Sequence, residues 1–227
     1  MRSNTMRSTH LAAIALSFML ASCQIPGLPT PEVEPPLEPP LEIEKQEELA
    51  ENKYIDLLDS TARMHRTEKR DILRDGFKEV IAKYPDSSYA HESHYHLMRA
   101  YLYNYDIPME KEAEEVYESY FRKYDDPKIG NALSLEMAKY YYQFQNWNKL
   151  ASFTVPFMRE FVETGKIRDG LFLFYYSEAK YKLKDYGEAL RGYVTFSKLY
   201  PNNKMGGFIN KRLKEIRHML GKEEAVQ

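Results

Sequence analysis

The chain has 227 residues, of which 43% are hydrophobic, 14% aromatic and 29% charged. This composition excludes a collagen-like protein, a wholly disordered protein and a multi-span membrane protein. Lys and Arg number 32 against 34 Asp and Glu, so the chain lacks the strongly basic character of a nucleic-acid-binding protein. The chain has ten glycines, 19 tyrosines and 11 phenylalanines. This excess of bulky aromatic residues over glycine favours a helical, tightly packed fold.

Residues 1–22 are typical of a secretory signal peptide. Arg2 and Arg7 give the start of the chain a positive charge without any acid, and an apolar run follows at residues 11–20. That run is too short to cross a bilayer as a helix, which takes about 20 residues. It has the length of the apolar core of a signal peptide.

Cys23 follows this segment as the only cysteine of the chain. The residues Leu20-Ala21-Ser22-Cys23 resemble the bacterial lipobox, in which the cysteine is lipidated and becomes the first mature residue. The alternative is that Cys23 is a buried thiol that follows an ordinary signal peptide. A single unpaired cysteine is unusual in an oxidising compartment. Gln24 is not the aspartate of an inner-membrane retention signal. In a Gram-negative host the resemblance therefore implies attachment to the outer membrane.

Residues 23–44 are expected to form a lipidated N-terminus and a tether. Residues 24–44 contain seven of the twelve prolines and five glutamates. Proline fixes φ and lacks an amide donor, so we expect a polyproline II segment with a rise of about 3.1 Å per residue. A disordered leader of no set length is the alternative. Either segment leaves the following domain tethered.

Residues 45–221 are predicted to be a domain of repeated helical hairpins, with residues 222–227 as a tail. Four segments place bulky residues at offsets 0, +4, +7 and +11, which is one face of a helix. They are Leu73, Phe77, Val80 and Tyr84; Ala113, Tyr117, Tyr120 and Tyr124; Leu150, Thr154, Phe157 and Phe161; and Ala189, Tyr193, Phe196 and Tyr200. A helix breaker follows each segment, at Pro85, Pro127, Gly165 and Pro201. Pro156 predicts a bend near residues 152–156.

A second helix is predicted before each segment, at residues 47–64, 89–103, 132–144 and 171–183. Residues 208–220 show the same periodicity and are expected to form a capping helix that stops at Gly221. Two helices per roughly 34–40 residues are the unit of a tetratricopeptide repeat or a related α-solenoid. The predicted fold class is therefore all-α, an α-solenoid of about four degenerate tetratricopeptide-like hairpins plus a C-terminal capping helix.

The last two units resemble tetratricopeptide repeats most closely. The fourth has Ser177, then Tyr186-Gly187-Glu188-Ala189, Tyr193 and Pro201 at the family's small, turn, aromatic and closing positions, and the third has Ala138, Tyr141 and Trp147. In this family the first helices of the units line a groove that receives a partner segment. The resemblance places six residues in such a groove: Tyr95, Arg99, Lys139, Tyr142, Glu178 and Tyr181.

The lipobox, the tether and four to five helical units together resemble outer-membrane lipoproteins of the BamD type, which scaffold the machine that inserts β-barrels. Residues 84–104 (YPDSSYAHESHYHLMRAYLYN) carry this resemblance most clearly. It implies a non-enzymatic, periplasm-facing scaffold in envelope assembly, anchored in the outer membrane by its lipid. The implied partners are envelope proteins, with no cofactor and no nucleic acid. A pilotin-like lipoprotein for secretin or pilus assembly is the alternative within this class.

The competing class is a cell-wall-binding or metal-binding protein or an enzyme built on the helical scaffold. The sequence contains neither G-x-x-x-x-G-K-[ST] nor G-x-S-x-G, so phosphate-cradling and nucleophile-elbow sites have no support. His91 and His94, three residues apart, are the candidate metal ligands. The alternative is that they are partly exposed residues on a helix surface.

Two basic clusters remain to be explained. They are Arg63, Arg66, Lys69 and Arg70, and Lys211, Arg212, Lys214 and Arg217. A solvated helix face is the simplest interpretation of both. Contact with anionic lipid or with an acidic partner is the alternative.

Overall fold

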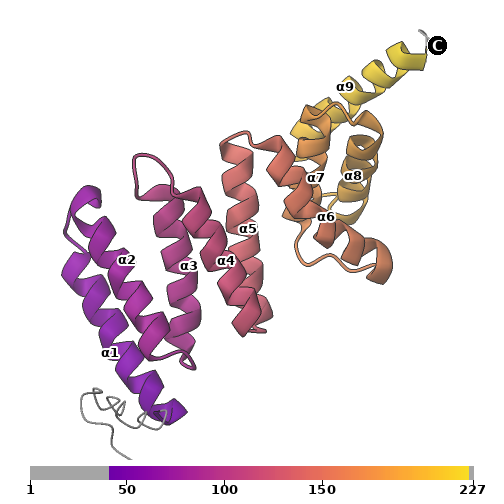
Figure 1. Ribbon diagram of the computed structural model, residues 1–227. Coiled ribbons are helices and arrows are strands. Elements are labelled where there is room, and N and C mark those ends of the chain that lie inside the picture. The colour runs from indigo at the N-terminus through magenta and orange to yellow at the C-terminus, as the bar shows by residue number, and fades with distance from the viewer. Residues whose placement is uncertain (1–40, 225–227) are drawn as a thin grey trace, which may run out of the picture. The chain divides into compact units, whose positions relative to one another are not determined.

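The computed structural model describes residues 41–224, with side chains through Gly221, and this part of the chain is built from helices alone (Figure 1). The predicted signal peptide, Cys23 and the tether up to residue 40 lie outside the described residues, as does the end of the predicted tail. Nine helices span the described part: α1 (Ile43–Thr61), α2 (Arg66–Lys83), α3 (Ser88–Tyr103), α4 (Glu110–Lys123), α5 (Pro127–Gln143), α6 (Trp147–Thr164), α7 (Gly170–Lys182), α8 (Tyr186–Leu199) and α9 (Gly206–Glu224).

Consecutive helices pack against each other as hairpins (Figure 1). The pairs are α1/α2, α3/α4, α5/α6 and α7/α8, and α9 packs on α8. The first helices of the pairs also contact one another in sequence, α1 with α3, α3 with α5 and α5 with α7. We call α1, α3, α5 and α7 the A helices, and α2, α4, α6 and α8 the B helices. This arrangement confirms the predicted all-α solenoid of four hairpins and a capping helix.

Short polar side chains start most of the helices. Ser87, Asp126, Asn146, Asp169 and Asp185 each precede a helix and accept a hydrogen bond from a backbone amide of its first turn. These bonds satisfy amides that have no partner inside the helix. Gly165 ends α6 with a φ of 69°, a conformation that glycine adopts without strain.

The repeated face predicted on the B helices forms the core. Of its sixteen positions, ten are buried and the other six are half-buried. Thr154, the one polar member, is fully buried, and its hydroxyl donates a hydrogen bond of 2.8 Å to the Leu150 carbonyl oxygen. The hydroxyl is therefore satisfied inside its own helix, and the position serves the core as an apolar residue would.

One predicted helix end is wrong, and one predicted bend stays a prediction. Helix α6 runs through Pro156 as a single helix, and the bend predicted near residues 152–156 remains a prediction. Helix α9 continues past Gly221 to Glu224. Gly221 does not have a positive φ, and a helical glycine costs only about 1 kcal/mol relative to alanine.

Two helix starts also differ from the predictions. Helix α1 begins at Ile43 rather than at residue 47, so the helical domain starts inside the predicted tether. Glu44 lies in its first turn, where the helix dipole favours an acid. Helix α5 begins at Pro127 rather than at residue 132, because Pro127 occupies the first turn of α5. A proline is tolerated there, since its missing amide would have had no partner in the helix.

Helices α7 and α8 approach each other most closely at Ser177 and Gly192. A Cβ atom on Gly192 would overlap the Ser177 hydroxyl, whereas a Cβ atom on Gly187 in the same helix would meet nothing within 4 Å. We expect Gly192→Ala to lower the free energy of unfolding by about 1–3 kcal/mol through overpacking. Gly187→Ala should raise it by about 0.5–1 kcal/mol, because alanine is the better helix former.

Urea unfolding followed by circular dichroism measures both values. Equal effects of the two substitutions would show that helix propensity alone, and not close contact, decides the outcome.

Candidate functional site

Two of the predicted groove residues meet at one carboxylate on the surface of the A helices. Arg99 of α3 places its Nε 3.8 Å from Glu136 Oε1, and Lys139 of α5 places its Nζ 3.0 Å from the same atom. The Arg99 and Lys139 side chains are 45% and 43% exposed. Two cations share one acid here, so this surface has an excess of one positive charge.

Aromatic rings lie beside both cations. The Arg99 guanidinium group lies 5.5 Å from the centre of the Tyr95 ring, and Lys139 Nζ lies 5.7 Å from the centre of the Tyr103 ring. Cations at such distances are attracted to the ring faces. The contacts fix the two long side chains against the helices, which lowers the entropy that they lose when a partner binds.

Glu136 is nearly buried and has two tyrosines as neighbours. Burial raises the pKa of Tyr103, and the charge of Glu136 raises it further. Burial, again assisted by Glu136, raises the pKa of Tyr175 to about 12. Both hydroxyls therefore stay protonated at neutral pH. Glu136, Tyr103 and Tyr175 were not among the predicted site residues, although an acid at an inward position of an amphipathic helix, as Glu136 is, can indicate such a site.

An apolar cavity of about 180 Å³ adjoins Arg99. Helices α1 and α2 supply Leu58, Leu73 and Phe77 to its lining, and His96, Arg99 and Tyr103 of α3 complete it. The apolar cavity lies beside the half-exposed cation Arg99. It therefore suits a partner segment that carries an apolar side chain next to an acidic group. We call Tyr95, Arg99, Lys139, Glu136 and this cavity the A-face site.

Tyr142 and Tyr181 lie farther along the A helices. The Tyr142 ring packs 5.7 Å from Phe174 and 5.4 Å from Tyr175, measured between ring centres. The Tyr181 hydroxyl donates to Glu215 of α9 at 3.1 Å. Tyr142 therefore borders the A-face site, whereas Tyr181 is held by the capping helix.

Glu178 is not available to a partner, which corrects its assignment to the groove. Its side chain is 1% exposed. Arg212 of α9 donates from Nε to Glu178 Oε1 at 2.9 Å, and the Tyr193 hydroxyl donates to the same oxygen. The capping helix thus covers this part of α7, and its guanidinium group also lies 4.2 Å from the Tyr181 ring centre. The pairing joins residues 34 positions apart, so helical periodicity could not reveal it.

His91 and His94 both pack against the rings of Tyr120 and Tyr124. His94 is buried, its Nδ1 lies 2.8 Å from the Ala90 carbonyl oxygen, and burial lowers its pKa. The His91 ring packs 4.3 Å from the Tyr124 ring, and its Nδ1 is 3.2 Å from the Tyr120 hydroxyl. Within residues 41–221, no three His, Cys, Asp or Glu side chains are grouped as a metal site requires. His91 and His94 thus act as packing residues between α3 and α4.

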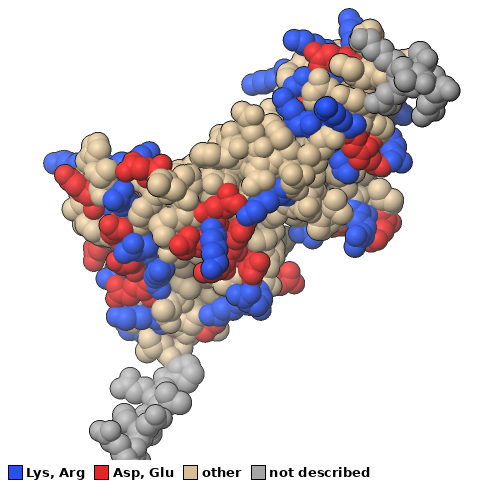
Figure 2. All heavy atoms as spheres, turned by 45° about the horizontal axis from the view of Figure 1, so that its top comes forward, with Lys and Arg blue, Asp and Glu red and all other residues tan. Residues whose placement is uncertain are grey.

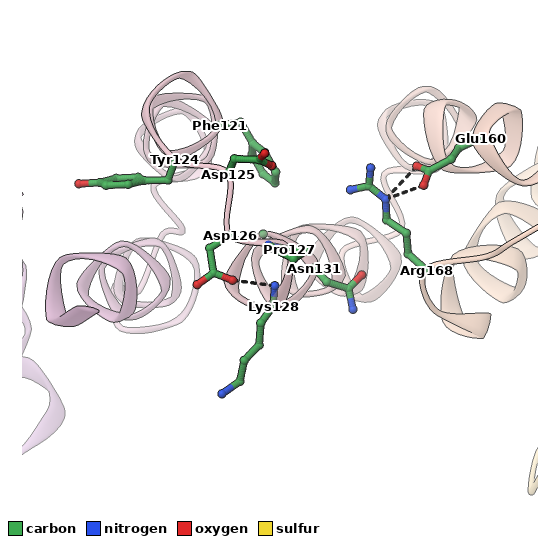
Figure 3. Close-up of a pocket in the computed structure, with 10 residues that line it drawn as sticks. Phe121, Tyr124, Asp125, Asp126, Pro127, Lys128, Asn131, Glu160 and Arg168 are labelled. Atoms are coloured by element: carbon green, nitrogen blue, oxygen red, sulfur yellow. Dashed lines mark hydrogen bonds and ion pairs between the residues drawn. The ribbon is translucent and has the colours of Figure 1, made fainter. Parts of the chain in front are cut away.

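A larger cavity of about 630 Å³ lies where α4 ends and α5 begins (Figure 3). Some of its polar groups bond one another, whereas Asn131 Oδ1 is buried without a hydrogen-bond partner among the described residues. Arg168 Nε donates to both oxygens of Glu160 at 2.8 and 3.1 Å, and Asp126 caps α5 by accepting from the Lys128 amide at 2.8 Å. The Lys128 ammonium group extends away from the labelled acids (Figure 3). The bonded groups hold the start of α5 and the loop after α6.

Comparisons with known proteins give no relative for this chain. No family model, no curated protein and no solved structure matches it. Among the helices of residues 41–224, none is long and apolar enough to span a bilayer. The account of the site therefore depends on the chain's own residues.

The buried pair of Glu178 and Arg212 gives a stability prediction. Arg212→Met leaves the Glu178 charge buried without its cation, so the free energy of unfolding should fall by about 3–5 kcal/mol. Adding Glu178→Gln should recover most of that loss. The neutral amide needs no counter-ion and still offers an oxygen to the Tyr193 hydroxyl.

Urea unfolding of the single and double variants measures this coupling. A double variant as unstable as Arg212→Met alone would contradict it. The exposed pair of Lys111 and Glu115 is the control, since its removal should change stability by less than about 0.5 kcal/mol.

Proposed function

We propose that this protein is a membrane-anchored, periplasm-facing scaffold in envelope assembly, similar to outer-membrane lipoproteins of the BamD type. Three features support the proposal: the lipobox-like residues ending at Cys23, the Pro- and Glu-rich tether, and the tetratricopeptide-like hairpins. In this proposal the lipid holds the chain at the outer membrane, and the helical domain presents a rigid surface to envelope proteins.

The A-face site is the observation that carries the proposal. Arg99 and Lys139 are half-exposed, share a single acid and adjoin an apolar cavity. Tyr and Arg are the residue types that most often dominate interface energies, above all beside a pocket that excludes water. Because Tyr95 and Arg99 lie on one helix and Lys139 on its packed neighbour, the site is already arranged before a partner arrives.

The proposed mechanism is binding without covalent chemistry. A partner segment lies across α3 and α5, places an apolar side chain in the cavity near Leu58 and Phe77, and sets an acidic group near Arg99 and Lys139. Anchoring by a lipid at Cys23 restricts the site to the membrane surface. It thereby raises the effective concentration of the site for partners in the same membrane. A pilotin-like role uses the same surface and differs only in the partner.

Capture from the native envelope tests the proposal. Full-length protein is purified in mild detergent beside three variants: Cys23→Ala, Arg99→Ala and Arg159→Ala. Arg99→Ala should reduce the specific partner at least about tenfold, the loss expected for a central interface arginine. The fold should persist, because Lys139 still neutralises Glu136. Arg159, exposed on the B helix α6, is the matched control and should retain the partner.

The identity of the captured protein decides between the branches. A β-barrel insertase supports the BamD-like scaffold, and a secretin or pilus component supports the pilotin-like role. Cys23→Ala should abolish capture from the membrane fraction. Equal recovery with all four proteins, or recovery of cell-wall material alone, would contradict the scaffold proposal.

A further inference from the structure

Charge is divided unequally along the array of helices. Residues 41–125 contain 20 acidic and 13 basic residues, whereas residues 126–227 contain 11 acidic and 17 basic ones. The whole chain is nearly neutral, so its composition conceals this division. The division does not hold for every helix, since α2 contains four acids and six bases, but α1 at one end is negative and α9 at the other end is positive.

Helix α1 is the acidic end. It holds six acidic and two basic residues, and both bases, Lys45 and Lys53, are engaged in ion pairs. Glu44, Asp56 and Asp59 are exposed and form no ion pair with any described residue. Asp59 also lies in the last turn of α1, where the helix dipole disfavours a carboxylate. The position of Asp59 thus does not serve the stability of its own helix.

Helix α9 is the basic end. Lys211, Lys214 and Arg217 are exposed, and none of the three pairs with an acid within residues 41–221. Lys and Arg side chains gather at the α9 end of the domain in Figure 2. The other basic cluster of the sequence differs, because Arg66 and Arg70 both pair with Asp106. Each sequence cluster is thus paired only in part: Arg63 and Lys69 of the first form no ion pair within residues 41–221, and Arg212 alone is paired in the second.

Both ends also expose apolar side chains next to these charges. Ile55 on α1 is 46% exposed and lies one residue from Asp56 and four from Asp59. Phe208 on α9 is 39% exposed and lies three residues from Lys211. The terminal units of a solenoid lack a neighbour on their outer side, and a natural array usually covers that side with polar residues. Here α1 exposes Ile55 beside its acids, and α9 leaves part of Phe208 exposed near Lys211, although the Phe208 ring also lies 5.9 Å from the Phe174 ring of α7.

We propose that α1 of one copy docks against α9 of a second copy, head to tail. The second copy is the occupant because it supplies the complement of both surfaces: acids around Ile55 meet bases around Phe208. This contact joins two different surfaces, so each bound copy leaves one free α1 and one free α9. Association then proceeds past the dimer into open chains. The proposed docking of α1 on α9 is independent of the A-face site, because the charged and apolar residues of the docking surfaces do not belong to the A-face site.

A charge-swap experiment tests the docking. The protein is residues 24–227, which retain the compact unit Leu41–Gln227. Sedimentation equilibrium is measured at about 50 mM and about 0.5 M salt, since screening lengths shorten with ionic strength. The weight-average mass should exceed twice the monomer mass at low salt. At high salt it should fall toward the monomer mass.

Two triple variants should each remain monomeric. They are Lys211→Glu with Lys214→Glu and Arg217→Glu, and Glu44→Lys with Asp56→Lys and Asp59→Lys. Each variant places like charges at both ends. An equimolar mixture should associate again, because the reversed α9 of one variant meets the reversed α1 of the other. The control reverses Lys111, Arg122 and Lys123 on α4, which should leave the mass unchanged from the parent protein.

Three results would overturn the proposal. The first is a monomer under all conditions, and the second is a mixture of the variants that does not associate. The third is a monomer that binds phosphatidylglycerol vesicles but not phosphatidylcholine vesicles, with loss of binding in the α9 variant. That result would assign the basic end of the array to a membrane surface instead.

Discussion

The packing of the aromatic face of each B helix against the neighbouring helices is the interaction on which the rest of the structure depends. No cysteine lies in residues 41–227, so no disulfide supports the helical domain. Tyrosine fills the space between layers and also carries a hydroxyl that must be bonded when buried. Tyr141 donates to Glu114 at 2.5 Å, and Tyr124 donates to the Pro85 carbonyl oxygen at 2.7 Å. The first bond joins the A helix α5 to the B helix α4, and the second joins the end of α4 to the turn before α3. Each bond fixes the position of one ring and so the register between the segments that it joins.

This packing determines where the A-face site lies. Each A helix packs on its B helix and also contacts the next A helix. The contact between α3 and α5 brings Arg99 close to Glu136. The site therefore depends on three hairpins, because α1 and α2 line its cavity, and would not exist in a single one. Among the described helices the same packing ends at α1 and α9. The A-face site and the two charged ends thus have one origin, the stacking of a repeated unit.

Periodicity predicts the local structure well, because it requires only that a helix bury one face. All sixteen residues of the repeated face are buried or half-buried. The prediction that the capping helix stops at Gly221 was wrong for a different reason. Glycine commonly ends a helix by adopting a positive φ, and Gly221 does not adopt one. That conformation cannot be read from the residue type.

The candidate site was only partly predictable. The tetratricopeptide resemblance placed Tyr95, Arg99 and Lys139 on one surface, and the structure brings the two cations to one acid. It also placed Glu178 there, but Arg212 binds that carboxylate from a helix more than 30 residues away. Pairings between distant helices decide which charges stay free, and a single sequence does not contain them.

Site-specific photo-crosslinking in the native envelope tests the central claim, that partners bind the A face. A photoreactive amino acid replaces Tyr95 in one variant of the full-length protein. In the other it replaces Val162, which is 81% exposed on the B helix α6. The account predicts a discrete protein adduct from position 95 and none from position 162. An adduct from position 162 alone, or equal adducts from both, would contradict it.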